Sequence, residues 1–142
     1  MEGPFRQRPD IASLNRLMAD TAGESLGIEI TELGPDFLRA TMPVDRRTKQ
    51  PYGLLHGGAS VLLAETLASL ASFLCLDPAA KQRTVGLEIN ANHLRSATEG
   101  VVTGTTRPIH VGRATQVWET RIEDAQGRLL CISRMTAAVI GG

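Results

Sequence analysis

The sequence predicts a single α+β domain in which an antiparallel sheet wraps around one long central helix. The first observation is an almost unbroken apolar run over residues 57–76, which is too long for a strand and contains one charge. The second is that segments with strand-like patterns lie on both sides of this run. The third is size, because 142 residues with 42% hydrophobic content are enough for one domain with a core.

The same features predict how the layers meet. An antiparallel sheet must bury one face, and the apolar helix is the one element able to cover it. A helix that is apolar on all sides must itself be buried on all sides. We therefore expect the sheet to cover one side of residues 57–76 and a partner to meet the other side.

The first 24 residues are expected to form an N-terminal segment, followed by the main domain over residues 25–142. Residues 1–9 carry two prolines and three charges and are expected to be a loose lead-in. Asp10 is a suitable N-cap for a short helix that ends near Ala22. Four apolar residues share one stripe of that helix: Ile11, Leu14, Leu17 and Met18.

Six strands are expected around the central helix. Two precede it, at residues 28–33 and 37–44, with a turn at Gly34-Pro35-Asp36 between them. Asp77-Pro78 ends the helix, and four strands follow. In the first of these four, apolar residues alternate with polar ones, which predicts that Val85, Leu87, Ile89 and Ala91 face the core. The other three strands are expected at residues 101–109, 114–122 and 129–140.

Charge and cysteine content exclude several classes of function. Lys+Arg and Asp+Glu are balanced at 15 each, so no global field attracts nucleic acid or an anionic membrane. The N-terminus has no apolar signal segment, which favours the cytoplasm. Cys75 and Cys131 form no CxxC pattern and are expected to be buried reduced thiols. No two histidines have the spacing of a metal site, so no metal is expected.

Glu65 is the only charge in the apolar run GGASVLLAETLASLASFLCL. A carboxylate among leucines and alanines loses several kcal/mol of hydration free energy unless another group pairs with it or uses it. A membrane span is an alternative, but the run is rich in Gly, Ala and Ser and has no flanking Lys/Arg asymmetry. A structural Glu that reaches the surface is the second alternative. The spacing to the helix entrance favours a catalytic role instead.

The entrance to the helix is His56-Gly57-Gly58, which has no Ser, Thr, Asp or Asn as N-cap. The N–H groups of the first turn are therefore expected to be free for a ligand, and the positive end of the helix dipole favours an oxyanion there. Glu65 follows Gly57 by eight residues, or about 12 Å along the helix. One reacting carbonyl cannot touch both groups. If both act, they come from two chains with antiparallel central helices.

Three stretches of the sequence resemble the hotdog-fold acyl-CoA thioesterases. They are MPVDRRTKQPYGLLHGGASVLLAET, VGLEINANHLRSA and GRLLCISRMT, and the most specific feature is HGG followed by Glu65 on the helix. Within that family the resemblance is greatest to the bacterial 1,4-dihydroxy-2-naphthoyl-CoA thioesterases and the proofreading thioesterases of enterobactin synthesis. It implies a hotdog fold, a homodimer that completes the active site, and a dimer of dimers.

The resemblance and the spacing together nominate five catalytic residues. Glu65 is expected to act as nucleophile or general base, and the Gly57 N–H to polarise the thioester carbonyl. Gln50 matches the glutamine that orients the thioester or the water in the family. Ser69 lies one helical turn after Glu65 and can hold the carboxylate or its attacking water. His56 is expected either to contact the thioester or to buttress the loop, with a plain capping role as the alternative.

Coenzyme A carries phosphates that need donors in a surface groove. Two segments at strand ends supply them, and the resemblance implies that both line the CoA site together with Gly86. The segments are His93-Leu94-Arg95-Ser96 and His110-Val111-Gly112-Arg113. Exposed arginines at strand ends are otherwise ordinary solvated surface.

The expected function is hydrolysis of aromatic or medium acyl-CoA thioesters with water, without a cofactor. Leu67, Leu70 and Phe73 are expected to shape the acyl pocket. Two rival functions stay open. One is a hydratase or dehydratase on the same fold, and the other is an acyl-CoA-binding protein without catalysis, in which Glu65 would be dispensable.

Overall fold

The computed structural model describes residues 3–142 and has an α+β architecture. Six strands form one sheet in the spatial order β1-β2-β4-β5-β6-β3, and every neighbouring pair is antiparallel. The strands are β1 (Glu29–Leu33), β2 (Leu38–Pro43), β3 (Gln82–His93), β4 (Val101–Val111), β5 (Thr115–Glu123) and β6 (Leu129–Gly141). The helices are α1 (Ile11–Arg16), α2 (Ala22–Ser25) and α3 (Gly57–Leu74). The predicted fold class is confirmed, and the sheet wraps around the central helix.

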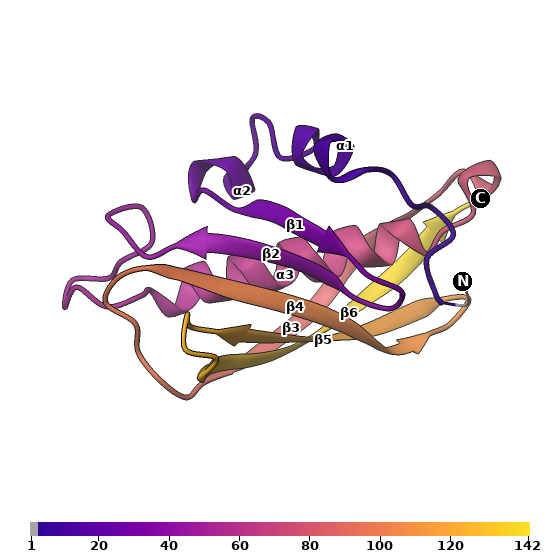
Figure 1. Ribbon diagram of the computed structural model, residues 1–142. Helices are drawn as coiled ribbons and strands as arrows, with labels where there is room; N and C mark the ends of the chain where they lie inside the picture. Colours follow the sequence, from indigo (N-terminus) through magenta and orange to yellow (C-terminus); the bar gives the residue numbers. More distant parts are fainter. Residues whose placement is uncertain (1–2) are drawn as a thin grey trace.

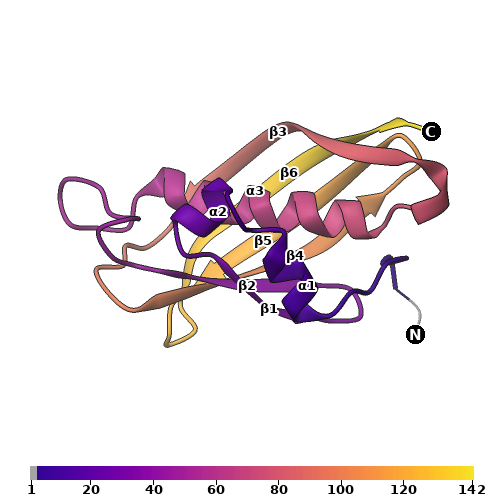
Figure 2. The same cartoon turned by 90° about the horizontal axis from the view of Figure 1, so that it is seen from above.

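Helix α3 lies along the concave face of the sheet, between the β1 edge and the β3 edge (Figures 1 and 2). Leu63, Leu67 and Leu74 on its inner side are fully buried, and Trp118 and Ile122 of β5 belong to the same core. Gly104 lets β4 approach the helix closely, because a Cβ there would lie 2.8 Å from a methyl carbon of Leu67. The expected layering of helix on sheet is therefore correct.

A chain of buried polar groups fixes the position of α3 against the sheet. The Trp118 indole N–H donates to the Gln116 carboxamide oxygen at 2.9 Å, and the Gln116 amide group donates to the Ser72 carbonyl at 3.3 Å. The hydroxyls of Ser72 and of Thr84 on β3 share a hydrogen bond of 2.9 Å. Because each of these hydrogen bonds has one specified geometry, the chain sets the rotation of α3 more closely than apolar packing alone.

The N-terminal segment is not a loose lead-in over the residues that the structure describes. The backbone N–H groups of Arg6 and Gln7 both donate to the Leu74 carbonyl at the end of α3. The Gln7 side chain donates to two further carbonyls of that terminus. Phe5 is buried and stacks on Trp118 with ring centroids 5.9 Å apart. These contacts satisfy carbonyls that a helix end would otherwise leave unpaired, which explains why the segment is ordered.

The first helix is shorter than its apolar stripe predicts. Asp10 is the N-cap, as expected, and its carboxylate accepts from the Ser13 N–H. Helix α1 ends at Arg16, however, and α2 forms a separate turn of helix, so Leu17 leaves the stripe and is 53% exposed. Leu14 and Phe5 belong to the same core as the sheet. The domain boundary after residue 24 stays a prediction.

Strand β3 contains a bulge that alters its predicted pattern. The pairing with β6 shifts register between Gly86 and Glu88, so Leu87 has no partner opposite. Ile89 and Ala91 face the core as predicted, but Val85 and Leu87 are exposed. The expectation that all four apolar residues share the buried side is wrong, because one extra residue reverses the alternation.

No element among residues 3–142 covers one side of α3 or the edge of β3. Glu65, Thr66 and Ser69 on this side are only half-buried, and Phe73 is 40% exposed. Helix α3 is long and apolar enough to cross a membrane by composition alone, but half of it is buried within the fold. We refer below to the uncovered side of α3 together with the β3 edge as the open face.

Removal of the Phe5 ring should destabilise the whole domain. Phe5→Ala is expected to lower the free energy of unfolding by about 3 kcal/mol, because it empties a buried aromatic site against Trp118. Urea unfolding followed by tryptophan fluorescence measures this. Arg6→Ala is the matched control, since its exposed ion pair with Asp77 contributes about 1 kcal/mol at most. Equal costs for the two variants would show that the segment is not part of the core.

Candidate active site

The Glu65 side chain lies on the open face of α3, against Gly86 of β3. A Cβ at Gly86 would come within 2.8 Å of Glu65 Oε1, so the glycine makes room for the carboxylate. The position is next to the β3 bulge, a feature that often lies beside functional sites. Among the described residues no donor or cation pairs with this half-buried carboxylate. Glu65 is therefore available to a ligand from the open side.

The entrance to α3 is capped by His56, which corrects the expectation of a free first turn. His56 Nδ1 accepts from the Gly58 N–H at 2.8 Å, and the His56 carbonyl accepts from the N–H groups of Ala59 and Ser60. The Gly57 N–H alone has no acceptor within residues 3–142. One donor, rather than the whole first turn, is thus left at the positive end of the helix dipole.

The capping bond also determines the chemistry left to His56. With Nδ1 accepting, a neutral imidazole carries its proton on Nε2, which can then donate to a ligand. The ring is exposed at the mouth of the helix. The capping alternative from the sequence is therefore realised, and it leaves a second donor near the Gly57 N–H.

Gln50 lies in the loop before α3 and its carboxamide faces its own turn. The Tyr52 N–H donates to Gln50 Oε1. Because a backbone N–H can only donate, the atom that faces it is the oxygen, and the Nε2 group is left to donate outward. Gln50 can thus donate through this amide group to a carbonyl or a water, as the resemblance implies.

Ser69 does not bind Glu65 in the single chain. Its hydroxyl forms no hydrogen bond to the carboxylate in the part of the chain that the structure describes, although its carbonyl accepts from the Ser72 hydroxyl at 2.9 Å. The side chain lies instead in a groove together with Leu70 and Phe73. Leu67, by contrast, is completely buried against β4, so the expectation that it lines an acyl pocket is wrong.

His93, which is predicted to line the CoA site, lies beside the entrance to α3. A Cβ at Gly57 would meet His93 Nε2 at 2.9 Å. The final residue of β3 therefore contacts the first residue of α3 within one chain. No local pattern predicts this contact, because 36 residues separate the two positions.

The two segments expected to hold CoA lie far apart in one chain. The Leu94 and Arg95 N–H groups donate to the Leu130 carbonyl near the start of β6, whereas the Val139 N–H near its end donates to Ala114, beside Arg113. Nine residues of extended strand span about 30 Å. Within one chain the two segments therefore lie at opposite ends of the sheet, and their role at a common CoA site stays a prediction.

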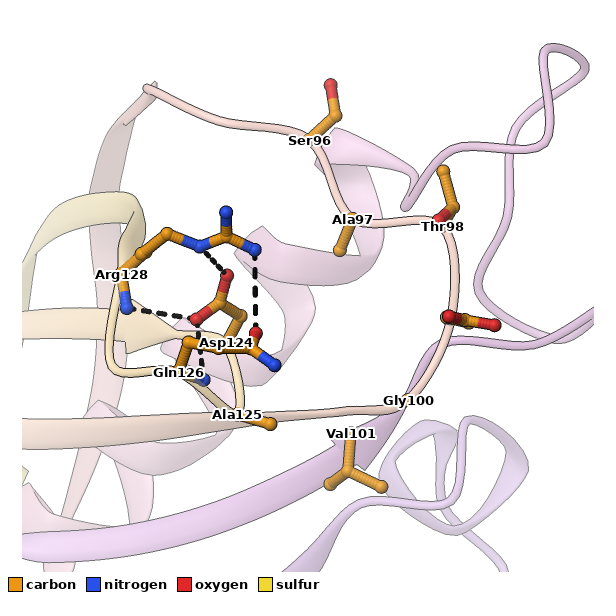
Figure 3. A pocket seen from close by; sticks show the side chains of 10 residues that line it. Ser96, Ala97, Thr98, Gly100, Val101, Asp124, Ala125, Gln126 and Arg128 are labelled. Atoms are coloured by element: carbon orange, nitrogen blue, oxygen red, sulfur yellow. Dashed lines mark hydrogen bonds and ion pairs between the residues drawn. The ribbon is translucent and has the colours of Figure 1, made fainter.

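Ser96 of the first segment lines a polar pocket of about 510 Å³ between residues 96–101 and the β5–β6 turn (Figure 3). Asp124 organises this turn, accepting from Arg128 Nε at 2.7 Å and from the Gln126 N–H at 2.9 Å. These bonds lower the pKa of the Asp124 carboxyl, although burial opposes them. Since Asp124 neutralises Arg128 and Glu99 adds a negative charge, the pocket does not favour a phosphate.

The two cysteines do not supply a nucleophile at the open face. No group of three or more His, Cys, Asp or Glu residues that could hold a metal occurs among residues 3–142. Cys75 and Cys131 are free and buried, as predicted. Burial raises the pKa of the Cys75 thiol to about 12 and raises that of Cys131 as well, so neither forms a thiolate nucleophile at neutral pH. Glu65 is therefore a better candidate nucleophile than either thiol.

Comparisons with known proteins agree on one family. The sequence profile of the thioesterase superfamily matches residues 52–131. The chain is 49% identical to the 1,4-dihydroxy-2-naphthoyl-CoA hydrolase of Escherichia coli, over 96% of this chain and 98% of that protein. It is 50% identical to the proofreading thioesterase EntH of Cronobacter turicensis, over the same shares. The crystal structure of thioesterase HI1161 from Haemophilus influenzae superimposes with a TM-score of 0.93 at 48% identity, covering 96% of this chain and 94% of that one.

Burial of both thiols predicts their reactivity. At pH 8 the native protein should not react with Ellman's reagent within minutes, because the pKa of Cys75 is about 12 and both sulfurs are inaccessible. Two thiols per chain should react after unfolding in guanidinium. Rapid labelling of the native protein would contradict the burial of these residues.

Proposed function

This chain belongs to the thioesterase superfamily and is a thioester hydrolase of hotdog fold, and we propose that it hydrolyses aromatic or medium acyl-CoA thioesters at sites shared between two copies of the chain. The observation that carries the proposal is a carboxylate, that of Glu65, on the same helix as an N–H, that of Gly57, both without a partner within residues 3–142. The E. coli relative is named for hydrolysis of an aryl-CoA, which supports this substrate class. We further propose that the enzyme works in the cytoplasm without a cofactor.

Glu65 is the nucleophile or general base of the proposed reaction. As nucleophile its carboxylate attacks the thioester carbonyl and the CoA thiolate leaves, after which water hydrolyses the anhydride. As general base it takes a proton from water, which attacks the carbonyl directly. Both routes place negative charge on the carbonyl oxygen. The Gly57 N–H, at the positive end of the α3 dipole, is suited to bind that charge.

The edge strand β3 supports a homodimer that completes this site. Along β3, Gly86 contacts Glu65 and His93 contacts Gly57. If the β3 edges of two chains pair antiparallel, with Gly86 of one opposite His93 of the other, Glu65 of one chain approaches Gly57 of the other. The pairing would also cover exposed Leu87 at the bulge.

The same pairing addresses the separation of the CoA segments. The hairpin that carries Arg113 lies near the start of β3, and Arg95 follows its end. Antiparallel pairing of two β3 strands brings the start of one beside the end of the other. Arg95 of one chain and Arg113 of its partner would then flank one groove, which supports a CoA site shared between subunits. A further association into a dimer of dimers follows from the resemblance and is part of the proposal.

Gln50 and His56 complete the proposed site as donors. Gln50 Nε2 and His56 Nε2 are the free ends of side chains whose other polar atom is engaged. Both can donate to the thioester carbonyl or to the attacking water. Ser69 is assigned to the acyl side of Glu65, since it lines the neighbouring groove.

Replacement of Glu65 tests the chemistry. Glu65→Gln should lower kcat for an acyl-CoA by at least about 100-fold with a small effect on KM, because the group acts on the reacting atoms. CoA release is measured with Ellman's reagent. Glu88→Gln on the outer face of β3 is the matched control and should retain activity. A fully active Glu65→Gln variant would favour the acyl-CoA-binding protein, and faster hydration of enoyl-CoA than CoA release would favour the hydratase.

Complementation tests the shared site. Gly57→Pro removes the free N–H, yet Pro is accepted at the first position of a helix, and His56 has the extended conformation (ψ 128°) that precedes a proline. Gly57→Pro and Glu65→Gln should each be inactive. Co-refolding equal amounts should restore about a quarter of wild-type activity, because each mixed dimer has one intact site.

Gly57→Ala is the matched control for this experiment. It adds the same Cβ that displaces His93 in Gly57→Pro. Because it keeps the backbone N–H, it should stay active. Failure of folded mixed dimers to recover activity would show that each site lies within one chain.

A further inference from the structure

A groove of about 470 Å³ lies on the open face between the N-terminal helices and α3. Leu17, Met18 and the following turn form one wall, and Thr66, Ser69 and Phe73 of α3 form the other. The lining is mainly apolar, and its one charge is Arg83 at the start of β3. Leu17 and Phe73 are 53% and 40% exposed. Two large apolar side chains on facing walls therefore contact water in the single chain.

The groove lies next to the Glu65 side chain, because Thr66 and Thr84 in its lining neighbour Glu65 and its contact Gly86. Thr84 and Gly86 are two residues apart on β3 and point to the same face. Gly86 contacts Glu65, and Thr84 both binds the Ser72 hydroxyl and lines the groove. The groove therefore begins at Thr84, the next residue on this face of β3 after Gly86, close to the proposed position of the thioester carbonyl. On α3 it extends to Phe73, eight residues or about 12 Å beyond Glu65.

We infer that this groove holds the acyl group of the substrate and that Leu17 and Met18 of the N-terminal segment determine the length of acyl group accepted. The inference rests on the proposed function, since it requires a thioester at Glu65. The occupant is an apolar acyl group up to about 12 Å long, which corresponds to a medium-chain fatty acyl or a fused-ring aryl group. A longer chain must pass the Arg83 guanidinium, which opposes burial of hydrocarbon beside it.

The N-terminal wall is built to adapt. Met18 packs on Gly23, because a Cβ built at Gly23 would lie 2.9 Å from the Met18 sulfur. The same Cβ would lie 3.8 Å from the Thr66 side chain of α3. The flexible thioether can shift without moving the backbone. Leu17 is outside any helix and projects from the wall, so its size changes the groove without disturbing the core.

The test compares kcat/KM for octanoyl-CoA and acetyl-CoA. Leu17→Trp, which narrows the groove, should lower the octanoyl to acetyl ratio by about tenfold relative to wild type. Leu17→Ala should raise the dodecanoyl to octanoyl ratio. Ile109→Trp is the matched control, because Ile109 on β4 is equally exposed (51%) but lies outside the groove, and its ratios should equal those of wild type.

The outcomes separate this inference from the proposed function. If both Leu17 variants keep the wild-type kcat/KM ratios, and the wild-type enzyme hydrolyses these acyl-CoAs, the groove does not hold the acyl group. The thioesterase proposal would then still stand. A change in oligomeric mass of Leu17→Trp by light scattering, without a change in ratios, would assign the groove to a subunit contact and also overturn the inference. A wild-type protein that hydrolyses none of the acyl-CoAs would refute the proposed substrate class itself.

Discussion

The burial requirement of α3 governs the rest of the molecule. An 18-residue helix that is apolar on every side cannot be covered by one curved sheet. The sheet covers the side with Leu63, Leu67 and Leu74, and the N-terminal segment caps the C-terminal carbonyls. What is left is a strip with Glu65 and Ser69 that is partly wet. The helix therefore combines a core role on one side with a substrate-facing role on the other, and an error in its rotation would affect both.

Two glycines provide the space that the polar side chains of this site occupy. At Gly86 and Gly57 the missing side chains create the space that Glu65 and His93 occupy. A strand is normally weakened by an interior glycine. Here the loss falls at the β3 bulge, where the ladder is already interrupted. The destabilising effect of this glycine on the strand is therefore smaller here than it would be within a regular ladder.

Much of the fold could be predicted from sequence because its signals are local. Apolar periodicity identified α3 and all six strands, and Asp10 marked the start of α1. Two of the misses were non-local. The order of residues 5–7 depends on carbonyls at Phe73, Leu74 and Leu76, and the bulge at Leu87 depends on register with β6. Glu65 was identifiable as the odd charge in an apolar run, whereas its neighbour Gly86 and the contact between His93 and Gly57 required the tertiary structure.

The strand order has a consequence for how the chain is made. Strand β3 pairs only with β6 among the described strands, so it leaves the ribosome well before its partner has been synthesised. Until then β3 has no strand with which to form hydrogen bonds. Phe5 likewise cannot stack on Trp118 until β5 has been synthesised. Such distant pairings slow folding, because the loop between them must close first. The surroundings of Glu65 on β3 are therefore among the last parts of the nascent chain to assemble. A ribosome that stalls before residue 129 releases a product in which β3 has no partner strand and this site does not form.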